Sequence, residues 1–289
     1  MGPLDVVRLT SLMGRTSGRP EISIGLIDGP VMLNLPDFGG TSIREVPGKL
    51  SGTCNRAETL ACSHGTFVAG ILAARRGSVA PAICPGCTLL LRPIFAETGN
   101  GNGFMPSATP QELAEAIVDS VVAGARVVNL SAALVQPSSQ GERILEDALN
   151  YTVSRGVITV AAAGNQGTVG SSAITRHPWV IPVAACNSQG RTLSESNLGG
   201  SIGRRGLSAP GEGVTSLGPD GKPKTFSGTS AAAPFVTGAI ALLWSEFPTA
   251  TASAIKLAAT HASGGSRRAT IAPPLLDAWA AYEAITSAR

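Results

Sequence analysis

The stretch GTSAAAP at residues 228–234, followed by the apolar run FVTGAIALL at residues 235–243, decides how the chain is interpreted. Small residues form a turn that places Ser230 at the start of a long apolar helix. At that position the serine side chain is open, and its backbone N–H lies at the positive end of the helix dipole, which suits a nucleophile whose attack creates an oxyanion. Taken alone, a serine before a helix is more often an N-cap. A catalytic interpretation therefore requires a base, an acid and an oxyanion donor elsewhere in the chain.

The composition indicates a well-buried α/β protein. Hydrophobic residues make up 43% of the 289 residues and charged residues only 14%, which excludes a disordered chain. Aromatic residues are few, so Ala, Val, Ile and Leu build the core, as is typical of a parallel sheet covered on both faces. Neither an internal repeat nor a shift in composition divides the chain. We expect one domain over residues 1–289, with an N-terminal extension at 1–20 and a C-terminal linker and helix at 263–289.

The charge pattern argues against nucleic acid and membrane partners. The formal net charge is +3, and the arginine pairs at 75–76, 204–205 and 267–268 are isolated and lack interleaved aromatic residues, which is typical of solvated loops. No apolar run approaches the roughly 20 residues that span a bilayer. The N-terminus shows no basic region followed by an apolar one, so no secretory signal is visible. The sequence predicts a cytoplasmic protein.

The cysteines do not form a closed framework, because their number, five, is odd. Cys84 and Cys87 have CxxC spacing, but no second CxxC or histidine pair completes a zinc site, so we predict no metal. Cys54 and Cys62 flank a loop just before His64 and would bridge in an oxidising environment, whereas free thiols are the default in the cytoplasm. The pairing of these residues and of Cys186 stays open.

Short apolar runs alternate with helical patterns along the chain, which predicts βαβ units and a mostly parallel sheet. The segment 109–112 carries a full capping box, with threonine as N-cap and proline at the first helical position. The segment 31–63 is rich in Pro, Gly and Ser and is predicted to be a long loop. The predicted strands are 22–27, 88–95, 126–131, 157–163 and 179–185, and the predicted helices are 65–75, 110–124, 142–154, 230–243, 252–261 and 275–287.

Polar residues follow three of the predicted strands directly. Asp28 follows the first strand, Ser131 the third, and Gly164 with Asn165 the fourth. Because ligands in open α/β sheets bind at the carboxyl ends of strands, we expect these groups to meet at one edge of the sheet.

His64 and Asn165 supply the remaining candidate groups. His64 is predicted to open a helix, where the dipole would lower its pKa and favour the neutral imidazole that a general base needs. The side-chain amide of Asn165, together with the Ser230 backbone N–H, would hold an oxyanion. The alternatives are a turn aspartate at Asp28, a surface histidine at His64 and a left-handed turn residue at Asn165.

Four motifs, in this order, resemble the signatures of the subtilisin-like serine proteases. They are DG at 28–29, HGTFVAG at 64–70, AAGN at 162–165 and GTSAAAP at 228–234. The resemblance covers residues 20–262 and implies a three-layer fold with a mostly parallel central sheet flanked by helices. It implies Ser230 as nucleophile, His64 as general base and then acid, Asp28 as the group that orients the imidazole, and Asn165 as oxyanion donor, with no cofactor.

The same resemblance implies that the substrate peptide binds as an added β-strand between two segments of the chain. The residues expected to contact it are Gly101, Gly103, Ser131, Ala132, Ala133, Ala162, Ala163 and Gly164. Ala133 stands where a glycine is usual, which suggests a tight pocket for a small residue before the cleaved bond.

The chain departs from the family pattern at two further points. Ala231 stands where methionine usually follows the nucleophile. The segment 75–79, where the family often carries a calcium loop, contains no carboxylate or asparagine, so we predict no calcium there.

Two segments resemble a narrower group, the subtilisin-like proteases that mature cyanobactin-type ribosomal peptides. They are AICPGCTLLLRPIF at 82–95 and GTSAAAPFVTGAIALLW at 228–244. In this group one kind removes the leader and another cuts and cyclises, and the cyclising kind carries a helical cap between the catalytic Asp and His. The corresponding segment here has no helical periodicity, which favours a leader-cleaving endopeptidase that uses water. The alternatives are a transamidating macrocyclase, a general protease and a peptide-binding protein without activity.

Overall fold

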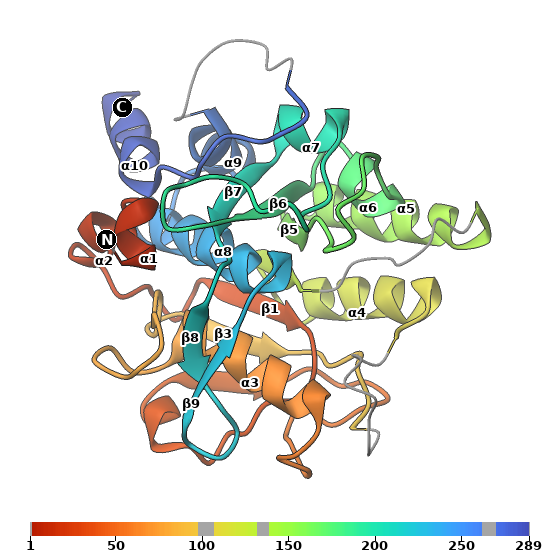
Figure 1. The fold of residues 1–289 in the computed structure, drawn as a ribbon, viewed down its shortest axis with the longest axis vertical. Coiled ribbons are helices and arrows are strands. Elements are labelled where there is room, and N and C mark those ends of the chain that lie inside the picture. The colour runs from red at the N-terminus through yellow and green to blue at the C-terminus, as the bar shows by residue number, and fades with distance from the viewer. Residues whose placement is uncertain (1, 98–106, 132–138, 262–269, 289) are drawn as a thin grey trace.

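A seven-stranded parallel sheet organises the chain, in the strand order β2-β3-β1-β4-β5-β6-β7 (Figure 1). The computed structural model describes residues 2–97, 107–131, 139–261 and 270–288. The parallel sheet predicted from the sequence is confirmed. Its strands are β1 Ser23–Ile27, β2 Ser42–Glu45, β3 Thr88–Leu91, β4 Val127–Leu130, β5 Ile158–Ala162, β6 Ile181–Cys186 and β7 Leu207–Pro210.

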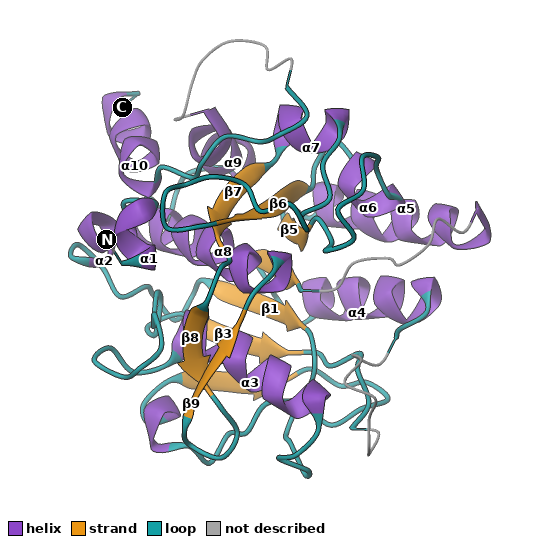
Figure 2. Cartoon of the chain, viewed as in Figure 1, coloured by secondary structure: helices purple, strands orange, loops and turns teal. Residues whose placement is uncertain are grey.

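Helices cover both faces of the sheet and complete the expected three layers (Figure 2). One core cluster packs α3 and α8 against the sheet, and a second packs α4 and α5 against the opposite face. The strands serve both clusters by alternation, since Ile24 and Leu26 belong to the first and Ile27 to the second. The helices are α1 Pro3–Val6, α2 Leu9–Met13, η1 Pro36–Phe38 (3-10), α3 Leu60–Ala73, α4 Pro110–Val122, α5 Ser139–Ser154, α6 Ala173–Arg176, α7 Gly200–Arg205, α8 Thr229–Glu246, α9 Ala252–His261 and α10 Ala278–Ser287.

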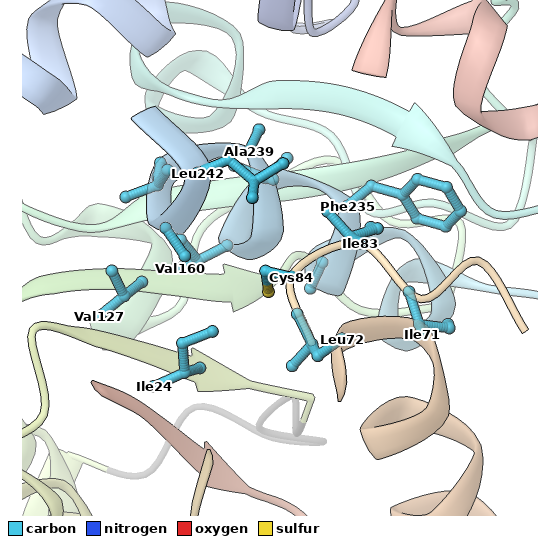
Figure 3. Packing of buried hydrophobic residues seen from close by; sticks show 14 of the residues in the cluster. Ile24, Ile71, Leu72, Ile83, Cys84, Val127, Val160, Phe235, Ala239 and Leu242 are labelled. Atoms are coloured by element: carbon cyan, nitrogen blue, oxygen red, sulfur yellow. The ribbon is translucent and has the colours of Figure 1, made fainter. Parts of the chain in front are cut away.

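Helix α8 runs through the centre of the first cluster. Its residues Phe235, Ala239 and Leu242 are fully buried and lie beside side chains of α3 and of the sheet (Figure 3). Small residues allow this close approach: a Cβ atom on Gly238 would lie 2.6 Å from Ile83 Cγ2. The helix that carries the candidate nucleophile in its first turn is therefore held on all sides by the core.

The prediction that residues 31–63 form one long loop is wrong. The segment contains η1 and the edge strand β2, and α3 begins at Leu60. Thr59 is the N-cap of α3, since its side chain accepts a hydrogen bond from the Cys62 N–H. Strand β2 escaped the sequence reasoning because its residues are mostly exposed and have no apolar alternation.

Other boundaries shifted by a few residues. The last helix begins at Ala278, because the Asp277 carboxylate caps it by accepting the Ala280 N–H at 2.8 Å. The capping box at Thr109 is confirmed at the start of α4. Strand β7 and the antiparallel hairpin of β8 Val214–Leu217 and β9 Pro223–Phe226 were not predicted.

The two end segments pack against each other (Figure 1). The Arg8 guanidinium lies 2.9 Å from an Asp277 carboxylate oxygen, and the Ala278 N–H donates to the Val7 carbonyl at 3.0 Å. Val7, Leu9 and Leu12 are fully buried, so the N-terminal segment contributes to the core. Among the described residues, no helix has the length and apolar character needed to cross a membrane.

Candidate active site

The site lies where the strand order reverses. Strand β1 pairs with β3 on one side and with β4 on the other, so consecutive parts of the chain diverge from this point. Asp28 directly follows β1, Ser131 follows β4, and Ala163 and Gly164 follow β5. The predicted meeting of polar groups at one sheet edge is confirmed, and it falls at a topological switch point.

Three side chains from distant parts of the chain form one hydrogen-bonded series. His64 Nδ1 lies 2.7 Å from Asp28 Oδ1, and His64 Nε2 lies 2.9 Å from Ser230 Oγ. Asp28 and His64 are buried, while Ser230 is half-buried. With Nδ1 protonated toward the carboxylate, Nε2 is free to accept the serine proton. This is the geometry of an activated nucleophile with an oriented base.

Two glycines let α3 lie directly on the end of β1. A Cβ on Gly29 would collide with the Ala61 carbonyl, and a Cβ on Gly65 would collide with the carbonyls of Gly29 and Pro30. The Gly29 N–H also donates to Asp28 Oδ1 at 2.6 Å. The carboxylate is therefore fixed by its own strand end while the helix presents His64 to it.

The prediction that His64 opens a helix is wrong, and so is the lowered pKa expected from it. His64 lies in the second turn of α3, which starts at Leu60. Burial lowers the pKa of the imidazole, but the charge of Asp28 and its hydrogen bond raise it by more, so that the pKa of His64 lies above its ordinary value. The carboxylate, not the helix dipole, sets the basicity of this group.

Ser230 is not the helix cap. It is the second residue of α8, after the N-cap Gly228, which has no side chain and adopts a φ of 124°. Its hydroxyl bonds to His64 instead of to the backbone. The capping function passes to Asn165, whose Oδ1 accepts the Thr229 N–H at 2.8 Å and the Thr229 hydroxyl at 2.9 Å.

The same contacts orient the Asn165 amide. With Oδ1 occupied by Thr229, Nδ2 is left as a donor, and it lies beside the Gly228 Cα, where a Cβ would come within 2.8 Å of it. In the part of the chain that the structure describes, neither Asn165 Nδ2 nor the Ser230 N–H has an acceptor. Two free donors at the nucleophile are what an oxyanion site needs.

A buried polar chain supports the nucleophile from behind. The Thr237 hydroxyl donates to Asn129 Oδ1 at 2.7 Å, and Asn129 Nδ2 donates to Ser131 Oγ at 2.8 Å. Ser131 Oγ in turn donates weakly, at 3.5 Å, to the Ser230 carbonyl. Pro234, four residues on, has no N–H to donate to that carbonyl. The sequence reasoning missed Asn129 and Thr237. The signal was a polar residue inside an apolar run, the strand β4 for Asn129 and the helix α8 for Thr237.

The expected substrate-binding residues are placed only in part. Ser131, Ala162, Ala163 and Gly164 lie at the ends of β4 and β5, and the Gly164 N–H donates to Thr229 Oγ1 at 3.1 Å. Gly101, Gly103, Ala132 and Ala133 lie outside the described residues. The small-residue pocket suggested by Ala133 stays a prediction.

Phe226, at the end of β9, was also missed. Its ring centroid lies 5.8 Å from that of His64 and 4.9 Å from that of Phe67, which it meets edge-on. It covers one side of the imidazole with apolar surface. Its hairpin is polar in sequence and showed no strand signal.

Cys54, Cys62 and the segment 75–79 link neighbouring parts of the chain, the cysteines by a disulfide and the segment by hydrogen bonds of Arg76. Cys54 and Cys62 form a disulfide with Cα atoms 5.6 Å apart, which is the pairing that the sequence allowed in an oxidising environment. Among the described residues the one group able to hold a metal is this pair with Glu97, and the disulfide removes both thiolates. The Arg76 guanidinium donates to three carbonyls, those of Met13 and Thr16 in the N-terminal segment and that of Ile83.

The family model of the subtilases, peptidase S8, matches residues 19–275, and the chain belongs to this family. Subtilisin E from Bacillus subtilis (strain 168) is 30% identical over 244 residues, which is 82% of this chain and 58% of that protein. The thermophilic serine proteinase from Bacillus sp. (strain AK1) is 34% identical over 234 residues, 80% of this chain and 54% of that protein. The chain thus spans about 58% of the length of the first curated relatives it matches.

Solved structures show the same fold. The protease domain of PatA superposes with a TM-score of 0.85 and 29% identity, covering 94% of this chain and 98% of that one. The prenylagaramide maturation protease PagA superposes with a TM-score of 0.81 and 28% identity, covering 95% and 98%. The patellamide maturation protease PatG, at 22% identity and a TM-score of 0.78 with 96% of each chain covered, supports the fold alone.

Proposed function

We propose that this chain is a serine endopeptidase that cleaves peptide bonds through an acyl-enzyme. The observation that carries the proposal is the unbroken series Asp28, His64, Ser230, with separations of 2.7 and 2.9 Å. Each member has the partner its role requires, and the nucleophile stands beside two free N–H donors. A peptide-binding protein without activity would have no need for this alignment.

The first half of the reaction forms the ester. Ser230 Oγ attacks the scissile carbonyl carbon while its proton moves to His64 Nε2, and the buried Asp28 carboxylate stabilises the imidazolium. The oxyanion receives hydrogen bonds from the Ser230 N–H and from Asn165 Nδ2. His64 then gives its proton to the leaving nitrogen, the C–N bond breaks, and the amine product departs.

The second half returns the enzyme. Water loses a proton to His64 Nε2 and attacks the ester carbonyl at the same oxyanion site. The C–O bond to Ser230 breaks, the proton passes to Oγ, and an acid product leaves. The polar chain through Ser131 reaches the Ser230 carbonyl in the first turn of α8.

We infer further that the substrate is a ribosomally made precursor peptide and that the cut removes its leader. Two observations support this substrate class. The neighbours PagA and PatA are maturation proteases by name, with 28% identity to this chain. Between Asp28 and Thr59, a range that the structure describes throughout, there is one 3-10 helix and one strand but no α-helical cap over the ester. The lack of such a cap in this range favours water over a peptide amine, so macrocyclisation is the second candidate.

A cytoplasmic location is part of the proposal. The Cys54–Cys62 disulfide argues against this location, because disulfides are rare in the cytoplasm. Trapping thiols with a mass tag in intact producing cells decides the point: tagging of both cysteines supports the cytoplasm, and protection of both contradicts it.

The test is incubation with a candidate precursor peptide and measurement of product masses. We expect linear fragments that together exceed the precursor by one water, and labelling of the enzyme by a fluorophosphonate. Ser230→Ala abolishes both, whereas Ser194→Ala, on an exposed loop, leaves both unchanged. Products of cyclic mass would support the macrocyclase. An enzyme that neither cleaves nor takes the label would contradict the proposal.

A further inference from the structure

A cavity of about 600 Å³ lies beside the catalytic histidine. One wall is the start of α3 with the residues before it, and the other is the turn that joins β8 to β9 together with the first residues of β9. The lining includes Glu58, Leu60 and Ser63 from the first wall and Asp220, Lys222 and Lys224 from the second. The catalytic mechanism uses none of these residues.

The cavity lies close to the group that protonates the leaving amine in the proposed mechanism. Ser63 immediately precedes His64 in α3, and the Lys224 ammonium lies 5.8 Å from the centre of the Phe226 ring, which itself contacts His64. His64 Nε2 protonates the leaving nitrogen, so the departing segment starts at this imidazole. Ser131 and Gly164, which follow β4 and β5, come from strands outside both walls.

The cavity is lined by two carboxylates, Glu58 and Asp220, and two ammonium groups, Lys222 and Lys224, but the carboxylates have partners of their own. The Glu58 carboxylate is taken by Arg56 at 2.9 Å, and Asp220 Oδ1 accepts the backbone N–H of Lys222. In the described part of the chain, neither Lys222 nor Lys224 has a carboxylate within ion-pair distance. The N-terminal end of α3, which carries the positive end of the helix dipole, also lies at the cavity, since Leu60 in the wall is its first residue. Among the described residues, both ammonium groups are therefore left without a direct ion-pair partner.

We propose that this cavity binds an acidic side chain of the peptide segment that follows the cleaved bond. The inference rests on the proposed endopeptidase function. Lys222 and Lys224 would then determine specificity on the leaving side, with the carboxylate of the substrate entering between the hairpin turn and the start of α3. The residues on the acyl side of the bond contribute to a separate part of the site.

The experiment compares quenched fluorescent peptides that share one cleaved acyl-side sequence. In each pair, aspartate or lysine occupies one of the first four positions after the cleaved bond. At the position that reaches the cavity, we expect kcat/KM to be roughly five- to tenfold higher for aspartate, the scale of one or two partly exposed charge pairs. Raising the salt concentration to about 0.5 M should reduce this ratio, because exposed pairs are screened.

Charge reversal tests the two lysines. In Lys222→Glu with Lys224→Glu the ratio should fall below one, and Lys222→Arg with Lys224→Arg should retain it. Because Lys224 lies over Phe226, the single variant Lys222→Glu is measured as well, and its ratio should fall partway. Lys49→Glu is the control for the single variant Lys222→Glu, because it makes the same change in net charge at an exposed site paired with Glu115. Its aspartate-to-lysine ratio should stay that of the wild type.

A nitroanilide of the same acyl-side sequence separates this inference from the proposed function, since it has no residue after the cleaved bond. Failure of nitroanilide hydrolysis and of fluorophosphonate labelling would overturn the function itself. Hydrolysis of the nitroanilide together with an aspartate-to-lysine ratio of one at all four positions would overturn the cavity proposal and leave the function standing. A wild-type preference that charge reversal does not change would also overturn it.

Discussion

The two helices that supply the catalytic side chains do so in different ways. Helix α8 presents Ser230 in its first turn, where the Ser230 backbone N–H has no acceptor among the described residues. Helix α3 presents His64 from its second turn, where its own N–H groups are bonded and the partner is Asp28 on the sheet. In the proposed mechanism the helix end serves the oxyanion, while a carboxylate from β1 serves the imidazolium. Each developing charge then has its own stabilising group, and each group can be removed separately.

The largest effect should come from removing the charge that serves α3. Asp28→Asn is expected to lower kcat about 10⁴-fold, the scale known for this change in serine protease triads, because a neutral amide neither stabilises the imidazolium nor fixes its tautomer. Nitroanilide kinetics measure it, with thermal unfolding as a check on folding. Asp147→Asn, on the exposed side of α5, is the matched control. A loss of less than tenfold would contradict the role of Asp28.

The next effect concerns α8. Asn165→Ala should lower kcat about 10²- to 10³-fold with little change in KM, a range known from subtilisin, a relative of this chain. It should also lower the free energy of unfolding by about 1 kcal/mol, because Thr229 loses its cap. Asn165→Asp keeps the acceptor for Thr229 but has no amide donor. If Asn165→Asp retains wild-type kcat, the amide is not an oxyanion donor.

The start of α3 can be located by a pair of substitutions. Thr59→Ala should lower the free energy of unfolding by about 1 kcal/mol, since the Thr59 side chain caps Cys62. Ser63→Ala should change it by less than about 0.5 kcal/mol, because in the described part of the chain the Ser63 hydroxyl has no partner. Urea unfolding measures both. The reverse order would mean that α3 begins at His64, as the sequence first indicated.

The smallest effect is a shift in pH dependence. Only neutral His64 accepts the serine proton, and its pKa is raised above the ordinary 6.5, so kcat/KM should rise with pH and reach half its maximum above pH 6.5. The sign for stability is opposite: protonated His64 stabilises the fold below pH 6.5, and this contribution is lost as pH rises through the folded-state pKa. A midpoint below 6.5 in the rate profile would show that the helix, not Asp28, governs His64.

The sequence was sufficient for the central sheet and for α8. Buried parallel strands form continuous apolar runs, and the small-residue turn before Ser230 leaves little choice of conformation. Asp28, Ser131 and Gly164 could be placed together because parallel strands share an edge. These positions thus followed from the strand ends, whereas His64, Ser230 and the proposed catalytic roles came from the motifs that resemble the family.

What the sequence did not reveal depends on long-range contacts. Strand β2 exists because β3 pairs with it, although its own residues are exposed. Asn129 and Thr237 are 108 residues apart and become partners only in the fold. The start of α3 was misplaced because the true cap, Thr59, stands at the end of a polar loop that carries no apolar periodicity. The predicted direction of the His64 pKa shift was wrong for the same reason, since that direction depends on the distance to Asp28.

The packing of the end segments has a topological consequence. Arg8 bonds to Asp277, and the Arg15 guanidinium lies 4.8 Å from the centre of the Tyr282 ring, so α1, α2 and α10 form one small unit beside the sheet. A short linker between the two ends would close the chain into a ring without moving a strand. The ring could then be opened at the exposed Gly77, in the loop between α3 and β3. Such a circular permutant would keep the order of strands in space, and hence the edge at which Asp28 and Ser131 meet, although their order along the chain had changed.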